Sequence, residues 1–453
     1  MAQGGRAAAR REIRAENSLI GALDPCQKRC GVFDGRPKLG EKDAPMRPFV
    51  PARVRPSRAL WCLVAVLALW AWPRDAHAYS WMIKYGYAQC GTCHMDPSGG
   101  ETLTHMGRVQ SDVLLSAMPE RNGYPRERAK FLFGMIDEPD SVRLGGSLRA
   151  MTIFKLPKGS SDSDLKVFPM QADIYGAGEF GSFLVGGSIG YAKVPGGSPH
   201  ARAAQVTAGQ GDDPNLISRT HYIGFELAEG TQLRLGRLNL PFGIRIPEHV
   251  MWAREATRTD RESDQQHGLA FAYNRNRWRA ELMAIAGNYQ VNPDDFRERG
   301  YSGYAEYMLS PTLAIGVSSL WTKARRDRLL LTSTGYVRNA HGVMGRIGIG
   351  DKLAILAEAD ILKSSQHKLG YVGMIQGDYE PLQGLHGMAT LELVDEGKST
   401  APGATATSGV GKMRTGVWLS AAYFMMAHLD ARVDLVLRKD DPVTAQAQLH
   451  FYF

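Results

Sequence analysis

The chain has 453 residues and a formal net charge of +8, and nearly all of the basic excess lies in its first 78 residues. That stretch holds 14 of the 54 Lys and Arg residues and 7 of the 46 Asp and Glu residues, which leaves 40 basic and 39 acidic residues elsewhere. This balance excludes the strongly basic surface that nucleic-acid binding requires, so we expect no nucleic-acid partner.

Residues 46–78 predict a signal peptide. Residues 46–58 carry four arginines, residues 59–72 form an apolar run, and Ala76-His77-Ala78 fits a signal-peptidase site. The apolar run is shorter than the about 20 residues that a membrane-spanning helix needs. We therefore expect an exported protein whose mature chain begins at Tyr79.

Residues 1–45 are polar and charged and precede this complete signal. We expect translation to start at Met46 and residues 1–45 to be a spurious extension. The alternative is a cytoplasmic extension that carries the pair Cys26 and Cys30. After cleavage the chain keeps only Cys90 and Cys93, which excludes a disulfide framework.

Cys90-Gly91-Thr92-Cys93-His94 is the Cys-x-x-Cys-His signature of covalent c-type haem attachment. The two thiols add to the vinyl groups of the haem, and the histidine is held where its ring can ligate the iron. The alternative is a redox or zinc Cys-x-x-Cys, but a structural zinc site needs a second ligand pair, which does not follow. The sequence predicts one haem c bound by Cys90, Cys93 and His94.

Residues 79–142 form the expected monohaem cytochrome segment. Ser98-Gly99-Gly100 is a flexible break, and apolar spacing predicts helices over residues 101–118 and 129–136. So short a segment would leave much of a haem exposed. We expect it to lodge in the mouth or lumen of the domain that follows, described below.

The second axial ligand is open. His105 and Met106 lie on the first expected helix, and Met118 and Met135 are further options. Met95 is adjacent to His94 and cannot reach the opposite haem face. We favour Met106 over His105; the alternative is that Met106 packs on the porphyrin and His105 is a surface residue.

Residues 143–453 predict a transmembrane antiparallel β-barrel. Apolar and polar residues alternate over 429–438 and 443–453, as in strands with one lipid-facing side. Strands of about 8–12 residues alternate between tight turns, such as Glu229-Gly230, and long polar segments, such as 397–411. We expect about 16 strands in an all-β fold; the alternative is a soluble β-sandwich. Trp252, Trp278, Trp321 and Tyr307 are candidates for aromatic girdles.

One stretch interrupts the barrel pattern. Pro241 and Gly243 break a strand, and charged residues gather beyond it. If the stretch folds inward, its guanidinium groups would meet the haem propionates. The alternative is a solvated loop with self-paired charges. The charged residues are Arg237, Arg245, Glu248, His249 and Arg254.

The order of parts resembles the fused monohaem c-type cytochrome–porins of Gram-negative outer membranes, a group that includes the iron-oxidase cytochrome–porins. The resemblance spans residues 46–453: a signal peptide, one Cys-x-x-Cys-His, a short cytochrome segment and a porin-sized barrel that ends in Phe453. Cys90, Cys93 and His94 carry over as haem-binding residues. The flanking sequence does not closely match the iron-oxidase version, which leaves the substrate open.

The resemblance implies an outer-membrane electron-transfer protein with one covalent haem c. Electrons would enter from extracellular Fe(II) or another donor and pass to a periplasmic cytochrome or other acceptor. Iron oxidation would make the protein an Fe(II) oxidase; otherwise it is an electron carrier. The alternatives are a passive solute porin with a haem-bearing plug or sensor, and a catalytic haem site such as a peroxidase. Oligomers are compatible with a porin.

Overall fold

A computed structural model describes residues 79–120, 125, 127–156, 164–193, 204–207, 214–248, 250–260, 264–291, 297–325, 335–400 and 412–453. The expected extension, the signal peptide and His249 lie outside the described residues. None of the helices in these ranges is long and apolar enough to cross a bilayer.

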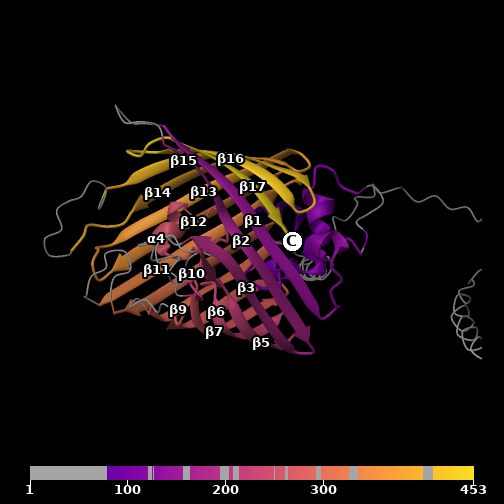
Figure 1. Ribbon diagram of the computed structural model, residues 1–453. Coiled ribbons are helices and arrows are strands. Elements are labelled where there is room, and N and C mark those ends of the chain that lie inside the picture. Colours follow the sequence, from indigo (N-terminus) through magenta and orange to yellow (C-terminus); the bar gives the residue numbers. More distant parts are fainter. Residues whose placement is uncertain are drawn as a thin grey trace, which may run out of the picture. The chain divides into compact units, whose positions relative to one another are not determined.

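The described residues form one closed antiparallel barrel (Figure 1). The strands are β1 Val142–Lys155, β2 Asp164–Phe180, β3 Phe183–Lys193, β4 Pro214–Ile217, β5 His221–Ala228, β6 Thr231–Leu238, β7 Gln266–Arg275, β8 Trp278–Gly287, β9 Arg299–Ser310, β10 Leu313–Ala324, β11 Tyr336–Ile349, β12 Leu353–Ser364, β13 Gly370–Leu382, β14 Leu385–Asp395, β15 Arg414–Met426, β16 Leu429–Arg438 and β17 Thr444–Tyr452. Because β4 and β5 pair with successive parts of β3, these 17 strands fill 16 positions. The expected strand number is confirmed.

Closure comes from β1, which pairs with β2 on one side and with β17 on the other. The sheet therefore has no open edge, and every backbone group of a spanning strand finds its partner within the sheet, as a bilayer requires. The alternative of a soluble β-sandwich is excluded by this single closed sheet.

Turns at the two ends of the barrel differ in length. Two or three residues join β5 to β6, β7 to β8, β9 to β10 and β11 to β12 at one end. At the other end the connections are longer, with 18 residues between β14 and β15. Short turns at one end and long loops at the other are the pattern of outer-membrane barrels, whose short turns face the periplasm. We call the first end the short-turn end.

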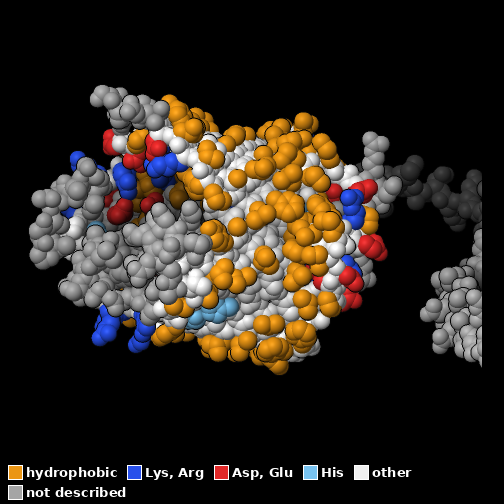
Figure 2. Space-filling model, viewed as in Figure 1, with side chains coloured by type: hydrophobic (Ala, Val, Ile, Leu, Met, Phe, Trp, Pro, Cys, Tyr) orange, Lys and Arg blue, Asp and Glu red, His pale blue; other side chains and the backbone are white. Residues whose placement is uncertain are grey.

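The outer face of the strands is apolar. Figure 2 shows hydrophobic side chains over the strand face, with charged side chains gathered toward the two ends. Trp278 and Trp321 are exposed on this surface as expected for girdle residues, and Trp278 packs on Tyr307 with ring centroids 4.8 Å apart. Trp252 is only 3% exposed and lies inside the barrel, so its assignment to a girdle is wrong.

Lipid exposure of the outer face predicts a large cost for a charge there. Val343, near the middle of β11, is 60% exposed and pairs with the equally outward Val317. We expect Val343→Arg to lower the free energy of unfolding in bilayers by about 2–4 kcal/mol, the range for arginine at the midplane of a barrel. Reversible urea unfolding in lipid vesicles measures this cost, with Val343→Leu as the control. An unchanged stability would contradict the lipid-facing assignment.

The segment before β1 is less helical than expected. Its elements are η1 Ser80–Tyr85, η2 Cys90–Thr92, α2 His105–Gln110, the π-helical turn η3 Ser111–Leu115 and η4 Phe131–Gly134. The helix expected over 101–118 begins only at His105, because Leu103 is extended and pairs with His94. The helix expected over 129–136 is wrong: only one 3-10 turn forms, and Leu132 and Phe133 have left-handed φ values of 50° and 57°. Phe133 instead packs edge-on against Phe453.

Candidate functional site

The Cys-x-x-Cys-His motif folds into one tight turn. The amides of Cys93 and His94 donate to the Cys90 carbonyl at 3.1 and 3.0 Å. The chain then reverses, so that His94 pairs with Leu103 and the Thr104 amide donates to the Cys93 carbonyl at 2.9 Å. Gly99 and Gly100 make the reversal with φ values of 87° and 102°, a region that glycine enters freely. The predicted flexible break is thus a hairpin that fixes the motif.

Cys93 and His94 line a cavity inside the barrel, which we call the His94 cavity. One side is formed by the segment before β1, and the other by the inner faces of β1, β2 and β17. Its volume is about 100 Å³, below the about 300–1,000 Å³ that is typical of ligand and cofactor sites, so its walls would have to move apart to admit a haem.

The Cys90 thiol does not line this cavity directly. It is buried and accepts a hydrogen bond from Arg279 Nη1 at 2.8 Å. Gly99, which does line the cavity, lies between this sulfur and His94: a Cβ at position 99 would be 3.3 Å from Cys90 Sγ and 4.0 Å from the His94 ring. Cys93 therefore lies on the wall of the cavity, and Cys90 lies behind Gly99.

We therefore expect Gly99→Ala to disturb the site through two separate effects. The methyl group would enter the space between Cys90 Sγ and His94, and φ of 87° is unfavourable for alanine. We expect several-fold less covalent haem per folded barrel, measured by haem absorbance against protein mass. Gly181→Ala is the control, because Gly181 also has a positive φ but no atoms near its would-be Cβ. Equal haem content in both variants would contradict the role of Gly99.

The charged stretch after β6 folds inward, but its residues separate. Arg245 lines the His94 cavity together with Arg149 of β1, so two guanidinium groups reach the space beside the motif. Arg254 instead pairs with Glu358, and Glu248 pairs with Arg432. Arg245 keeps its support as a propionate contact, whereas Arg254 and Glu248 are buried and pair with residues of the barrel wall, so the alternative of a solvated loop with self-paired charges is wrong for them.

Arg237 also lies elsewhere. It is fully buried, and its Nη1 donates to Asn288 Oδ1 at 3.0 Å while its Nε donates to the Arg219 carbonyl at 2.8 Å. These contacts tie neighbouring connections of the barrel to the wall. Arg237 is therefore held by connections of the barrel wall.

The structure does not bring the expected second ligands to the His94 cavity. Met106 is 42% exposed, and its sulfur accepts a hydrogen bond from Gln110 Nε2 at 3.4 Å. His105 lines a different pocket beside Lys130. Met118 and Met135 are both largely exposed. The helix start at His105 turns this face of α2 away from the motif.

The motif is anchored to the barrel wall by buried ion pairs. Asp96 accepts from Arg234 Nη1 at 2.5 Å and from the Ser98 amide at 2.8 Å. Burial alone would raise the pKa of Asp96, but the Arg234 charge and the Ser98 hydrogen bonds outweigh it and hold the pKa below its usual value. The pairing therefore contributes stability above the ordinary carboxyl pKa that is lost in stronger acid. No local pattern in the sequence predicts this long-range contact.

The segment before β1, which carries the motif, enters the barrel at the short-turn end (Figure 1). Trp81, Met82 and Ile83 are buried against inner-wall side chains, including Met388 and Phe424. Arg346 of β11 donates to the Ala88 carbonyl at 2.9 Å. The expectation that the segment lodges in the mouth or lumen is confirmed.

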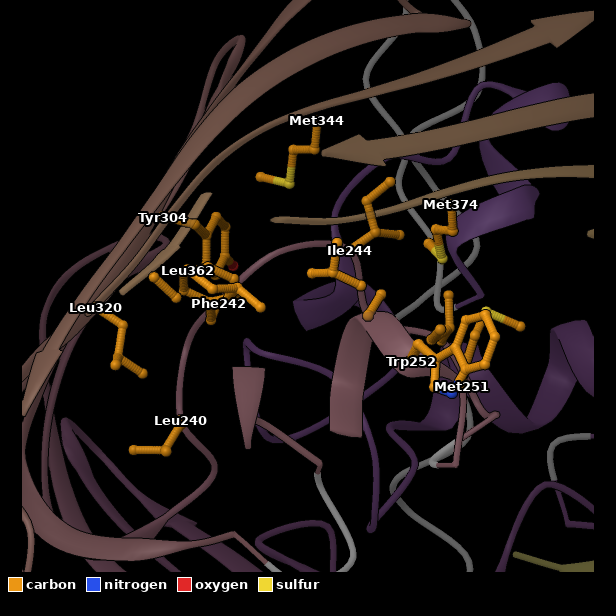
Figure 3. Packing of buried hydrophobic residues seen from close by; sticks show 14 of the residues in the cluster. Leu240, Phe242, Ile244, Met251, Trp252, Tyr304, Leu320, Met344, Leu362 and Met374 are labelled. Atoms are coloured by element: carbon orange, nitrogen blue, oxygen red, sulfur yellow. The ribbon is translucent and has the colours of Figure 1, made fainter. Parts of the chain in front are cut away.

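A second inward segment, described over residues 239–248, 250–260 and 264–265, occupies the interior beyond it. It carries α4 Trp252–Thr257, which lies within the ring of strands (Figure 1). Its apolar side chains pack on inner-wall residues as shown in Figure 3, where Leu240, Phe242, Ile244, Met251 and Trp252 face Tyr304, Leu320, Met344, Leu362 and Met374. Most of the cluster is less than 5% exposed. In the described chain, two segments thus occupy the lumen.

Nothing in the described chain resembles a site for Fe(II) as substrate: no three His, Cys, Asp or Glu side chains there converge as metal ligands. The acidic pairs Asp212–Asp213 and Asp294–Asp295, which could attract cations, lie outside the described residues. Fe(II) as the donor stays a prediction.

Comparison with known proteins identifies the fold. The barrel is similar to in-vitro folded OmpT, an outer-membrane protein of Vibrio cholerae in its trimer form, with 12% identity and a TM-score of 0.50 over 69% of this chain and 99% of that one. It is also similar to OmpF of Salmonella typhi in complex with daunomycin (13% identity, TM-score 0.49, 69% and 97% covered) and to the outer-membrane channel DcaP of Acinetobacter baumannii (12%, 0.48, 69% and 97%). No family model and no curated protein matches the sequence.

The similarity to OmpT and the closed 16-position barrel with an apolar outer face give a porin-like fold. A barrel of this kind, with short turns at one end and long loops at the other, is a protein of the bacterial outer membrane. The protein lies in the outer membrane of a Gram-negative bacterium.

Proposed function

We propose that the protein is an outer-membrane electron-transfer protein that carries one covalent haem c in the mouth of the barrel. The observation that carries the proposal is the position of the Cys-x-x-Cys-His turn, with Cys93 and His94 on the wall of a cavity inside a closed barrel. Cys90 and Cys93 would tether the group, and His94 would ligate its iron. Arg149 and Arg245 would face its propionates.

A haem held there would supply a one-electron Fe(II)/Fe(III) couple. The protein's own contribution is burial. Apolar packing by Trp81, Met82 and Ile83 on one side, and by the second inward segment on the other, would limit the access of water to the site. Such burial is one of the means by which a protein sets a haem potential.

The position at the short-turn end also favours a partner. In outer-membrane barrels this end faces the periplasm. A haem there would exchange electrons with a periplasmic cytochrome or another soluble acceptor. The apolar band of such barrels is about 25 Å tall, so an extracellular donor such as Fe(II) is separated from the site by most of the lumen. A second cofactor or a mobile donor would have to bridge it.

A passive solute porin is the second candidate, because the fold is that of porins. The two segments that occupy the lumen favour the electron carrier. Planar-bilayer conductance of the purified protein, combined with a redox titration of its absorption spectrum, separates the two. We expect reversible haem redox with little steady conductance. Large, steady conductance from a protein without a redox-active chromophore would establish the porin instead.

A catalytic haem site such as a peroxidase needs an open iron position. Carbon monoxide added to the ferrous protein tests this, since an electron carrier with two protein ligands binds it slowly. Adding ferrous iron as the reductant in the same titration tests whether Fe(II) is a donor.

A further inference from the structure

We propose that His450, on the last strand of the barrel, is the second axial ligand of the haem iron. This inference rests on the proposed function and assigns a residue that lies far from the motif in sequence. His450 lines the His94 cavity and is 7% exposed. It approaches from the barrel wall, whereas His94 approaches from the segment in the mouth, so the two imidazoles border one space from different structural elements.

The ring of His450 is held as metal-ligating histidines are held. Its Nδ1 lies 3.1 Å from Asp430 Oδ2 on the neighbouring strand β16. Because the carboxylate can only accept, Nδ1 carries the proton and Nε2 presents its lone pair. A carboxylate on the far ring nitrogen fixes the tautomer, orients the ring and makes the ligating nitrogen more basic.

The Nε2 atom of His450 contacts a serine hydroxyl that has a second acceptor nearby. Ser147 Oγ on β1 lies 2.9 Å from His450 Nε2 and also 3.3 Å from Gln171 Oε1. When iron takes the Nε2 lone pair, the serine hydroxyl can donate to Gln171 instead. Ligation therefore leaves no buried donor without an acceptor, a loss that would otherwise destabilise the site.

The wall that carries His450 is in direct contact with the haem segment. Tyr452, two residues on, has its hydroxyl 3.0 Å from Ser111 Oγ of η3 and stacks on His450 with ring centroids 4.9 Å apart. Residues of β1 and β17 pair here, with Arg149 opposite His450. The site would therefore be complete only when the first and last strands have closed the barrel.

Met82 is the competing ligand on the same cavity. Its side chain is 2% exposed and belongs to the apolar cluster of η1 with Trp81 and Ile83. That packing accounts for Met82 without a ligand role. Two imidazoles would set a lower reduction potential than an imidazole and a thioether.

The test uses the full mature protein with its haem and does not depend on turnover. Near-infrared magnetic circular dichroism of the ferric wild type should show two imidazole ligands and no methionine–iron band. His450→Ala should lose the low-spin ferric signal and bind carbon monoxide rapidly when reduced, and added imidazole should restore the low-spin signal. His450→Met should raise the potential. Met82→Leu, the matched control, should leave all these spectra unchanged.

A methionine–iron band in the wild type, or an unchanged low-spin spectrum in His450→Ala, would overturn the proposal. The wild-type spectrum decides even if His450→Ala fails to fold. A wild-type protein without covalent haem would instead overturn the proposed function, so the two failures are distinguishable.

Discussion

Replacing both Cys90 and Cys93 by serine is expected to abolish covalent haem attachment and to leave the barrel folded. A thioether needs the sulfur of each cysteine, and serine cannot form one. Serine does preserve shape and the hydrogen bond that Arg279 gives to position 90. The wall contains neither residue, and closure depends on the pairing of β1 with β17. We therefore expect complete loss of haem stain on a denaturing gel, with unchanged heat-modifiable migration of the barrel.

Cys90→Ser alone is the matched control. It keeps Cys93, so one thioether remains and the haem stays bound through denaturation. The reduced pyridine complex then shows the shifted absorption band of a haem with one free vinyl group. Haem stain that persists in the double variant would contradict attachment at the motif. Loss of the folded barrel would show instead that the two cysteines are structural.

The barrel follows from sequence because its signals are local. Period-two alternation over 429–438 and a turn such as Glu229-Gly230 each fix a strand or a connection without reference to the rest of the chain. Closure adds little further information, since a chain with this pattern has no other way to satisfy its backbone groups in a bilayer.

The interior follows much less well, because its structure depends on long-range contacts. Pro241 and Gly243 showed that a strand ends, but not that Trp252 would be carried on α4 into the lumen. The sequence predicts one cluster for the arginines near them, because these residues are close together along the chain. In the folded chain Glu358 binds Arg254, and Arg245 reaches the His94 cavity.

His450 is a residue of the proposed site that sequence patterns alone do not reveal. In sequence it is one of several polar residues that alternate along the C-terminal strand, and nothing distinguishes it from Gln446 or Gln448. Its difference is the Asp430 carboxylate across the sheet, which the register of β16 and β17 places opposite it. Only strand pairing reveals this contact. The haem-binding role of Cys90, Cys93 and His94 rests on the motif and stays a prediction.

Lys84, which holds the segment before β1 against the barrel wall, gives the second prediction with a large expected effect. This lysine of η1 is buried, with its Nζ 2.9 Å from Asp378 Oδ1 and 2.8 Å from Glu380 Oε2 on the inner wall of β13. Backbone contact is close as well, since a Cβ at Gly348 would be 2.3 Å from the Lys84 Cα. One cation thus holds two carboxylates that are shielded from water.

Lys84→Met leaves both carboxylates without that cation. Removing one partner of a buried ion pair costs up to about 3–5 kcal/mol, because the remaining charge is desolvated. Here the cost is at the low end, since the His386 imidazole stays beside both carboxylates, with Nδ1 3.0 Å from Asp378 Oδ2. We expect this cost to appear as local opening of residues 79–94, not as unfolding of the barrel, whose strands keep their own ladders. Hydrogen exchange measured by mass spectrometry should therefore show faster exchange in η1 and unchanged protection in β10–β12.

The matched control removes the charge imbalance and keeps the shapes. In the triple variant with Lys84→Met, Asp378→Asn and Glu380→Gln, no buried charge lacks its partner, so most of the lost protection should return. A single variant with wild-type protection would mean that the segment is held by apolar packing of Trp81 and Ile83 alone. Equal loss in the single and triple variants would mean that the lysine's hydrogen bonds matter and its charge does not. Recovery in the triple variant would instead show that a buried charge balance fixes the segment in the mouth of the barrel, where we propose that the haem is held.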